Sequence, residues 1–514
     1  MSRCVTGTDR WDKIVQSLGS IKLSEFQDAI AAAIDKFSLP PFLPQLIHLE
    51  WEKYQVTAEQ TAVPNVAETF KLNPTLHLVA LDWKLSGLFE NSVQNGPVQS
   101  GREVSAIWRD PVSKSVRLKA ISKENLLALK FVEEDFRIDP VTDTGANSEI
   151  IAQSLRQTVK EGMIIPSRLM LRRDIDVLCH SNPKNPDLIY PDNFTLQWHV
   201  TNVCDLHCKH CYDRSEQSPL TCAQGKSILS DLKRFCCERY VGGHVCFTGG
   251  NPLLYPHFFE LYAAAREHGF STSILGNPTT IENLQRIVDI QKPTFFQVSL
   301  EGLEGHNDFI RGKGFFKRVF TFLDLLHKLE VRATVMLTLT KDNIDQILPL
   351  ADLLRGHADN LAFNRLASVG EGANLLLPSK RTYADFLKAY VEASKVNPIL
   401  GYKDNLINIV LDRQGQNLFR GCTRYGCGAA FNFIAVLPNG DAHACRKFPS
   451  PIGNLVTQNI AEIYDSPAAI SYRRGIAACD GCRLRLVCGG CFAVLHGLGK
   501  NISKDRDPYC FIDR

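Results

Sequence analysis

The sequence lacks the features that mark secreted, membrane-bound or nucleic-acid-binding proteins. No apolar run approaches the roughly 18 to 20 residues that a membrane helix needs. Residues 1–10 hold no apolar core followed by a small-residue cleavage site, as a secretory signal would. The net charge is only +3, and acidic and basic residues are interspersed without a basic block. These absences predict a cytoplasmic protein with no nucleic-acid partner and no membrane partner.

Internal repeats and low-complexity segments are also absent, and 514 residues are too many for one compact domain. Residues 1–175 contain a single cysteine, Cys4, and the segment Asn182–Pro186 has the composition of a linker. A cysteine-rich region begins near residue 415. We therefore expect three domains, over 1–175, 190–375 and 415–514.

Helical periodicity in the first domain covers about 23–35, 45–56 and 122–137. The segment 148–166 has the pattern of an amphipathic helix, a glycine and an apolar strand. These patterns predict a mainly helical domain.

Strand-like and helix-length segments alternate between residue 190 and about 370. The strands are expected at 194–200, 244–248, 271–275, 295–300, 332–338 and 361–366, with helices at about 222–240, 256–268, 280–290, 315–329 and 343–355. Six strand–helix units in a row predict an α/β fold with a parallel sheet, a partial (β/α)6 barrel. The active site of such a barrel lies at the carboxyl ends of the strands.

The seventeen cysteines are too many and too clustered for ordinary core residues. Disulfide frameworks belong to small secreted domains, which this chain does not resemble. Three cysteines lie within 204–211 and eight within 422–510, a clustering that indicates ligation of soft metal centres. The other six, which we expect to be buried apolar residues, are Cys4, Cys179, Cys222, Cys236, Cys237 and Cys246.

The first group, Cys204, Cys208 and Cys211, follows directly on the first expected strand of the barrel. Three thiolates from one loop can bind three irons of a four-iron cluster and leave the fourth iron open. A zinc site is the alternative, although structural zinc normally takes four protein ligands.

The spacing CxxxCxxC of this group resembles the signature of the radical S-adenosylmethionine (SAM) superfamily. The resemblance implies that the open iron binds SAM, whose reductive cleavage gives a 5′-deoxyadenosyl radical, and that the three cysteines are the catalytic ligands. Further segments resemble SAM-binding motifs of that family, among them the run Gly249-Gly250-Asn251, in which asparagine replaces the usual glutamate. The implied cofactor contacts are Gly249, Gly250, Asn251, Asn277, Ser299, Arg311 and Leu366.

The eight C-terminal cysteines resemble the SPASM extension of peptide-modifying radical SAM enzymes. That resemblance implies two further four-iron clusters, three in all, each of the two held by four cysteines in a crossed arrangement. The implied ligand sets are Cys422, Cys427, Cys445 and Cys491 for the first, and Cys479, Cys482, Cys488 and Cys510 for the second. Two zinc-ribbon-like sites are the alternative. Cys491 departs from the pattern, because two residues rather than three separate it from Cys488.

The expected function is modification of a ribosomally made precursor peptide by a radical SAM oxidoreductase. The resemblance to SPASM proteins implies an oxidative crosslink or a modification derived from Cys or Ser. Within that class, the run from Gly249 to Pro256 and the long N-terminal extension resemble the thio(seleno)oxazole-modification maturases. A flavodoxin- or ferredoxin-type donor is expected to supply electrons. The alternatives are a maturase of a folded protein such as a sulfatase, and a non-enzymatic zinc-binding or electron-transfer protein. Sulfatase maturases carry an aspartate where this chain has Arg446.

The N-terminal domain resembles a small helical domain found beside peptide-modifying enzymes, on the residues 39–46, Leu49 to Trp51, and Trp108 to Pro111. The resemblance implies recognition of the precursor peptide, at a sheet edge or in a groove near Trp51 and Trp108. The alternative is a structural cap on the barrel.

Overall fold

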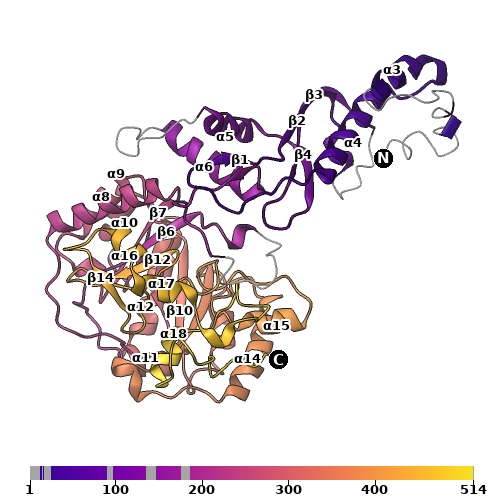
Figure 1. Cartoon of the computed structure of the whole chain (residues 1–514). Coiled ribbons are helices and arrows are strands. Elements are labelled where there is room, and N and C mark those ends of the chain that lie inside the picture. Colours follow the sequence, from indigo (N-terminus) through magenta and orange to yellow (C-terminus); the bar gives the residue numbers. More distant parts are fainter. Residues whose placement is uncertain are drawn as a thin grey trace. The chain divides into compact units, whose positions relative to one another are not determined.

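The computed structural model describes residues 12–13, 16, 25–89, 97–134, 146–174 and 186–512. The chain forms two compact units, Met1–Met170 with Asn182–Pro186, and Leu171–Ser181 with Asp187–Arg514 (Figure 1). Cys4, Cys179 and all but the last residue of the expected linker lie outside the described residues. In the part of the chain that is described, no helix has the length and apolar character needed to span a membrane.

Over residues 25–89, 97–134 and 146–170, the first unit combines four α-helices with two small antiparallel sheets. The helices are α3 (Phe26–Phe37), α4 (Leu43–Ala58), α5 (Lys123–Glu133) and α6 (Ala146–Glu161), and the strands are β1 (Lys71–Leu72), β2 (His77–Trp83), β3 (Ser100–Arg109), β4 (Val116–Ala120) and β5 (Ile164–Ile165). One sheet has the order β2-β3-β4, and the other pairs β1 with β5. The helices hold more residues than the strands, as predicted, but the sequence patterns missed the three-stranded sheet.

Local signals fix the ends of these helices. Pro44 lies in the first turn of α4, where its missing N–H is no loss, and Ser122 caps α5 by accepting a hydrogen bond from Asn125 N. Leu46 of α4 and Ile107 of β3 are fully buried in the core of this unit. Trp108 is also fully buried, and its Nε1 donates to Glu161 O at 3.0 Å. Trp108 is therefore a core residue that cannot itself contact a peptide, while the groove near Trp51 and Trp108 stays a prediction.

The second unit is built on one nine-stranded sheet in the order β11-β10-β9-β8-β7-β6-β12-β13-β14. The six barrel strands are β6 (Asn193–Thr201), β7 (Gly242–Gly249), β8 (Ser271–Leu275), β9 (Phe296–Ser299), β10 (Ala333–Leu339) and β11 (Asn360–Arg365), all parallel to their neighbours. They match the six predicted strands, so the partial (β/α)6 barrel is confirmed. The strand β12 (Phe433–Val436) pairs parallel to β6, and β13 (Asp441–His443) and β14 (Pro451–Asn454) continue antiparallel.

Helices follow the barrel strands as the alternation predicts. They are α8 (Cys222–Glu238), α9 (Phe258–Glu267), α10 (Ile281–Ile290), α11 (Glu304–Arg311), α12 (Phe315–Lys328) and α13 (Ile347–Leu353). The short helix α11 was not predicted. The C-terminal part adds α14 (Lys380–Ser394), α15 (Ile407–Arg413), α16 (Ile460–Asp465), α17 (Pro467–Arg474) and α18 (Phe492–Gly497).

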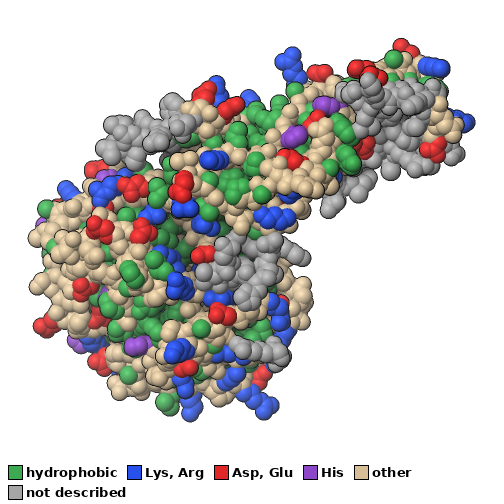
Figure 2. Space-filling view, viewed as in Figure 1, with side chains coloured by type: hydrophobic (Ala, Val, Ile, Leu, Met, Phe, Trp, Pro, Cys, Tyr) green, Lys and Arg blue, Asp and Glu red, His purple; other side chains and the backbone are tan. Residues whose placement is uncertain are grey.

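The core of this unit explains why the barrel strands appear in the sequence as nearly continuous apolar runs. Val245 and Phe247 of β7, Leu337 of β10 and Phe363 of β11 are fully buried, as is typical of parallel strands covered on both faces. On the face shown in Figure 2, basic and acidic side chains are interspersed, in agreement with the balanced charge of the sequence. The polar side chains that carry the chemistry lie instead at the carboxyl ends of the strands.

Candidate active site

The carboxyl ends of the barrel strands border a cavity of about 480 Å³. Gly249 ends β7, Leu275 ends β8, Ser299 ends β9 and Arg365 ends β11, and all four line it. The loop 202–214, which follows β6, closes one side of the cavity. This position agrees with the strand-end site that the barrel predicts.

Cys204, Cys208 and Cys211 line this cavity and are half-buried. Backbone contacts hold their loop, since Cys211 N donates to Cys208 O at 3.2 Å and Lys209 N donates to Ile310 O at 3.0 Å. Burial raises the pKa of the Cys204 and Cys208 thiols, so both favour the protonated form when no cation is bound. Among the described cysteines, no fourth one lines this cavity. The donor set therefore fits a four-iron cluster with one open iron.

The glycine run after β7 packs against the start of the cysteine loop. Gly249 has φ +139°, and a Cβ there would lie 2.1 Å from Thr201 O. Gly250 N donates to Thr201 O, and Asn251 N donates to Val203 O, both at 2.8 Å. The glycines are thus needed for close approach of the two loops, and both also line the cavity.

Asp205, between the first two cysteines, gathers the polar side chains around Cys204. Asn277 Nδ2 donates to Asp205 Oδ1 at 2.6 Å and lies 3.5 Å from Cys204 Sγ. Asn251 Nδ2 donates to the same carboxylate oxygen at 3.1 Å, and Arg318 Nη2 donates to Oδ2 at 2.9 Å. Burial opposes ionisation of Asp205, but these hydrogen bonds hold its pKa below the usual value. Asn251 supports this carboxylate and is not among the residues that line the cavity.

Arg311 lies beside Cys208, as a SAM-binding arginine should, but most of its guanidinium is already paired. Its Nη2 and Nε donate to Glu301 Oε1 at 2.6 and 3.0 Å, and its Nη1 lies 3.6 Å from Cys208 Sγ. Glu301 is 2% exposed, and its Oε2 accepts from Thr338 N at 2.8 Å. Burial works against its ionisation, yet His210 and Arg311 lower its pKa. The sequence indicated neither Glu301 nor His210 as part of the site.

The last predicted contacts complete the wall of the cavity. Ser299 and Asn277 line it directly, as does Leu366, which follows β11 and is 2% exposed. Leu366 can therefore contribute apolar surface that keeps water away from a bound ligand. Of the seven predicted cofactor contacts, six line the cavity and Asn251 lies behind it.

The eight C-terminal cysteines fall into two groups of four. Those that line a second cavity, of about 320 Å³, are Cys422, Cys427, Cys445 and Cys491. Burial and the neighbouring thiols Cys422, Cys491 and Cys445 raise the pKa of Cys427 strongly. Four thiols that oppose each other's ionisation suit a site whose charge a bound metal centre balances. Cys491 lies in this group despite its unusual spacing.

The remaining group, which lines a third cavity of about 470 Å³, is Cys479, Cys482, Cys488 and Cys510. Burial, followed by the proximity of Cys482 and Cys510, raises the pKa of Cys479 to about 11. The two groups are those that the crossed arrangement implies, and each offers the four sulfurs that close a four-iron cluster.

Asp507 connects the two groups to the barrel. Its Oδ1 and Oδ2 accept from Arg365 Nη1 and Nη2 at 2.8 and 2.7 Å, and Oδ2 also accepts from Cys491 N at 3.1 Å. Its backbone oxygen accepts from Cys510 N at 2.9 Å. This one buried residue therefore contacts Arg365 and Cys491 through its carboxylate, and Cys510 through its backbone oxygen.

Residues 198–354 match the radical SAM superfamily, and residues 427–491 match the SPASM iron–sulfur cluster-binding domain. The first match contains the end of β6, the three-cysteine loop and the four strands β7 to β10, and the second begins and ends on cysteines of the second cavity. The chain is a radical SAM protein with a SPASM domain.

Relatives of this radical SAM protein match different shares of it. Fe-coproporphyrin III synthase of Methanosarcina barkeri is 29% identical over 187 residues, which is 35% of this chain and 45% of the synthase. The mycofactocin maturase MftC of Mycolicibacterium smegmatis is 28% identical over 343 residues, 61% of this chain and 82% of the maturase. The crystal structure of Streptococcus suis SuiB bound to its precursor peptide SuiA has a TM-score of 0.53 at 16% identity, covering 80% of this chain and 96% of SuiB. The last similarity shows a shared fold.

In this radical SAM protein the SPASM cavity adjoins the strand-end cavity. Arg446 and Lys447 line both, as do Gln297, Met336 and Asn364. Arg446 Nη1 lies 3.4 Å from Thr248 Oγ1, and its guanidinium lies 5.9 Å from the ring centre of Tyr212, which follows Cys211. No sequence pattern indicated that residues 446 and 447 reach the barrel, because their contacts there are remote along the chain.

Proposed function

We propose that this radical SAM protein modifies a ribosomally made precursor peptide, by an oxidative crosslink or a change to Cys or Ser such as a thio(seleno)oxazole. The observation that carries the proposal is the wall shared by the three-cysteine cavity and a four-cysteine cavity. A substrate oxidised in the first cavity must give up an electron, and the neighbouring site can accept it. The proposed cofactors are SAM and three four-iron clusters.

When bound, a four-iron cluster with an open iron supplies the electron that cleaves SAM to methionine and a 5′-deoxyadenosyl radical. The role of the protein is to hold the cluster and to orient SAM. Cys204, Cys208 and Cys211 are the proposed iron ligands, and Arg311 has Nη1 left to pair with the SAM carboxylate. Backbone carbonyls of the glycine run suit the amino group, since the N–H groups of Gly250 and Asn251 are already used. We expect a flavodoxin- or ferredoxin-type donor to supply the electron.

For peptide recognition we propose the first unit, which has a core of its own. Its sheet β2-β3-β4 has two edge strands, β2 and β4, and a sheet edge can pair with an extended leader peptide. The rings of Trp51 and Tyr54 stack with their centres 5.4 Å apart, and Tyr54 is 61% exposed. This pair offers the peptide an aromatic contact beside the sheet. The similarity to SuiB, whose structure holds its precursor peptide, supports this assignment. The match covers 80% of this chain, which is more than the second unit alone contains, so it includes part of the first unit.

Removal of the first unit tests the proposal. The truncated chain should start at residue 171, because Leu171 N donates to Arg239 O and Arg173 Nη2 donates to Cys427 O at 2.7 Å within the second unit. With the peptide encoded beside the gene as substrate, we expect modification to fall about a hundredfold, through loss of the effective concentration that a leader-binding domain provides. Mass spectrometry of the peptide measures it.

Two controls make the truncation decisive. Iron content and 5′-deoxyadenosine formation should stay at the level of the full chain, and a leader-free core peptide should react equally with both proteins. Normal modification of the full-length precursor by the truncated chain would make the first unit a structural cap. If no encoded peptide is modified but a sulfatase is, the protein is a maturase of folded proteins, and zinc in place of iron would favour the non-enzymatic alternative.

A further inference from the structure

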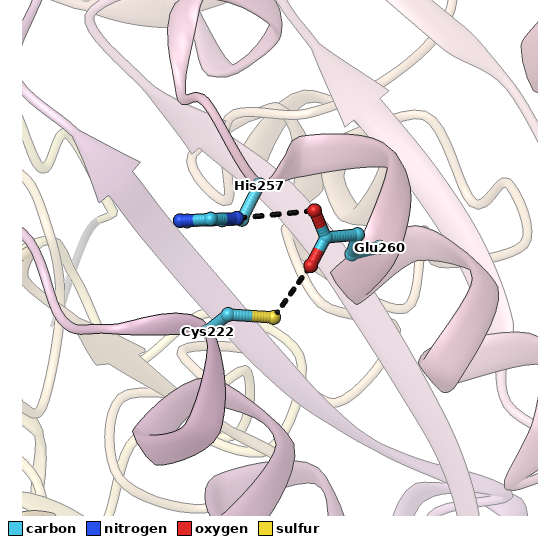
Figure 3. Close-up of side chains that lie close together, drawn as sticks. All are labelled: Cys222, His257 and Glu260. Atoms are coloured by element: carbon cyan, nitrogen blue, oxygen red, sulfur yellow. Dashed lines mark hydrogen bonds and ion pairs between the residues drawn. The ribbon is translucent and has the colours of Figure 1, made fainter.

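A Cys, a His and a Glu meet on the surface of the barrel, away from the described cluster cavities (Figure 3). Cys222 is the first residue of α8, His257 precedes α9, and Glu260 lies in the first turn of α9. Cys222 Sγ lies 3.1 Å from Glu260 Oε2, and His257 Nδ1 lies 3.1 Å from Glu260 Oε1. One ligand atom of each residue lies within 4.8 Å of the others.

The fold brings these residues together at the ends of two active-site loops. The segment that follows β6 and contains the three cysteines ends where Cys222 begins α8. The segment that follows β7 and contains the glycine run ends at His257. Tyr255 Oη donates to Leu220 O at 2.6 Å and already joins the two loops beside the cluster of three. This side-chain-to-backbone hydrogen bond holds the two loops together next to the three residues.

Cys222 is half-buried, whereas His257 and Glu260 are exposed. The prediction that Cys222 is a buried apolar residue is wrong, because it is half-buried and its Sγ donates to Glu260. Cys237 is likewise half-buried, whereas Cys236 and Cys246 are buried as predicted. Burial and the Glu260 hydrogen bond raise the pKa of Cys222, while contacts with Cys222 and then His257 lower the pKa of Glu260.

We propose that Cys222 Sγ, His257 Nδ1 and a Glu260 oxygen bind one divalent transition-metal ion, with zinc as the ion that this donor set suits and water in the fourth position. Sulfur, imidazole and carboxylate are the three ligand types that zinc takes in proteins. Binding releases the thiol proton of Cys222 to solvent, and the site carries no redox change. The nearby charge of Lys226, one turn along α8, favours the ionised thiol but weakens attraction of the cation.

The consequence for the barrel is a metal link between the two loops that border the active-site cavity. The link would hold the start of α8 against the start of α9, next to the Tyr255–Leu220 hydrogen bond. Its ligands differ from those of the iron sites, which offer sulfur alone. This difference allows the two kinds of site to be told apart in the holoprotein.

The test adds one equivalent of Zn²⁺ to the iron-loaded full chain and removes unbound metal by gel filtration. We expect one retained zinc per chain, and a zinc absorption-edge spectrum with one sulfur at about 2.3 Å and nitrogen or oxygen at about 2.0–2.1 Å. Cys222→Ala and Glu260→Gln should each weaken zinc binding by at least about tenfold, since loss of a direct ligand should cost no less than loss of a supporting contact. Iron content should not change.

Cys237→Ala is the matched control, because Cys237 is a half-buried thiol on the same helix. It should retain zinc like the unchanged protein. Three or four sulfurs around the zinc would place the ion in a cluster site and overturn the proposal. So would equal retention by the unchanged protein and Cys222→Ala. Neither result depends on the substrate that the enzyme modifies.

Discussion

The site with three cysteines and the sites with four differ in what the chain places around the sulfurs. At the strand ends, Asn277 lies 3.5 Å from Cys204 Sγ and Arg311 lies 3.6 Å from Cys208 Sγ, and a cavity of about 480 Å³ lies beside them. In the SPASM cavities, by contrast, every cluster that the cysteines can form has its four irons ligated by the chain. The number of sulfurs therefore separates a site that can bind a reactant from sites that can only pass electrons or hold the fold.

The two kinds of site are nevertheless joined through buried polar contacts. Arg365 ends β11, lines both neighbouring cavities, and pairs with Asp507, which accepts from the Cys491 amide. The proposed electron transfer and the structural support thus involve the same wall. Four sets of substitutions test these roles.

The largest effect is expected when the open site is removed. Changing Cys204, Cys208 and Cys211 together to Ala should abolish reductive cleavage of SAM, because no other described cysteines line that cavity. Iron should fall from about twelve to about eight per chain, the content of two four-iron clusters. Liquid chromatography of 5′-deoxyadenosine and an iron assay measure both. Continued formation of 5′-deoxyadenosine would contradict the assignment.

Removal of ligands from a closed site should separate cleavage from product. With Cys482→Ala and Cys488→Ala, the cavity that contains Cys479 and Cys510 loses half of its sulfurs. We expect 5′-deoxyadenosine to form still, because the open site is untouched, while modified peptide falls by at least about tenfold, as loss of direct metal ligands should. Mass spectrometry and chromatography on the same reaction give the ratio. An unchanged ratio would mean that this site only supports the fold.

A smaller change to the connection should loosen both closed sites at once. Asp507→Asn replaces a carboxylate that is 2% exposed and paired with Arg365, and breaking a buried ion pair costs about 3–5 kcal/mol. We expect a lower temperature for the loss of cluster absorbance, and loss of iron from the SPASM sites before the barrel site. Asp385→Asn breaks an exposed ion pair with Lys388 and should change neither, since such pairs contribute little. Equal behaviour of the two variants would contradict the role of Asp507.

Local patterns explain what could be predicted from the sequence. The six barrel strands are near-continuous apolar runs, and the cysteines carry their spacing in the chain itself, so both were visible without a fold. The three-stranded sheet of the first unit was not, because the exposed positions of β2 include the apolar residues Leu78 and Ala80, so its alternation of burial is not an alternation of apolar and polar residues. The helix α11 was missed because it has only eight residues, and the sequence predicted only a cofactor contact there, at Arg311.

Contacts between residues remote in the chain explain what was missed at the site. Arg446 reaches Thr248 across nearly two hundred residues, and Asp507 reaches Arg365 across more than a hundred. No spacing in the sequence encodes such pairs, since they depend on how β12 is added beside β6. The pairing of Arg311 with Glu301 is closer in sequence, but only the structure shows that it uses most of the guanidinium.

The smallest effect is expected at Asn251, where this chain departs from the glutamate of the resembling family. Its Nδ2 donates to Asp205 Oδ1 at 3.1 Å, so a glutamate there would set two carboxylates side by side behind Cys204. Asn251→Glu should weaken SAM binding about tenfold, because Asp205 loses a donor and gains a like charge. Adding Asp205→Asn should recover most of that loss, since residues in contact do not behave additively. Equilibrium binding of SAM to the iron-loaded variants measures both changes. If the double variant binds SAM no more tightly than Asn251→Glu, the contact with Asp205 does not explain why this chain has asparagine at position 251.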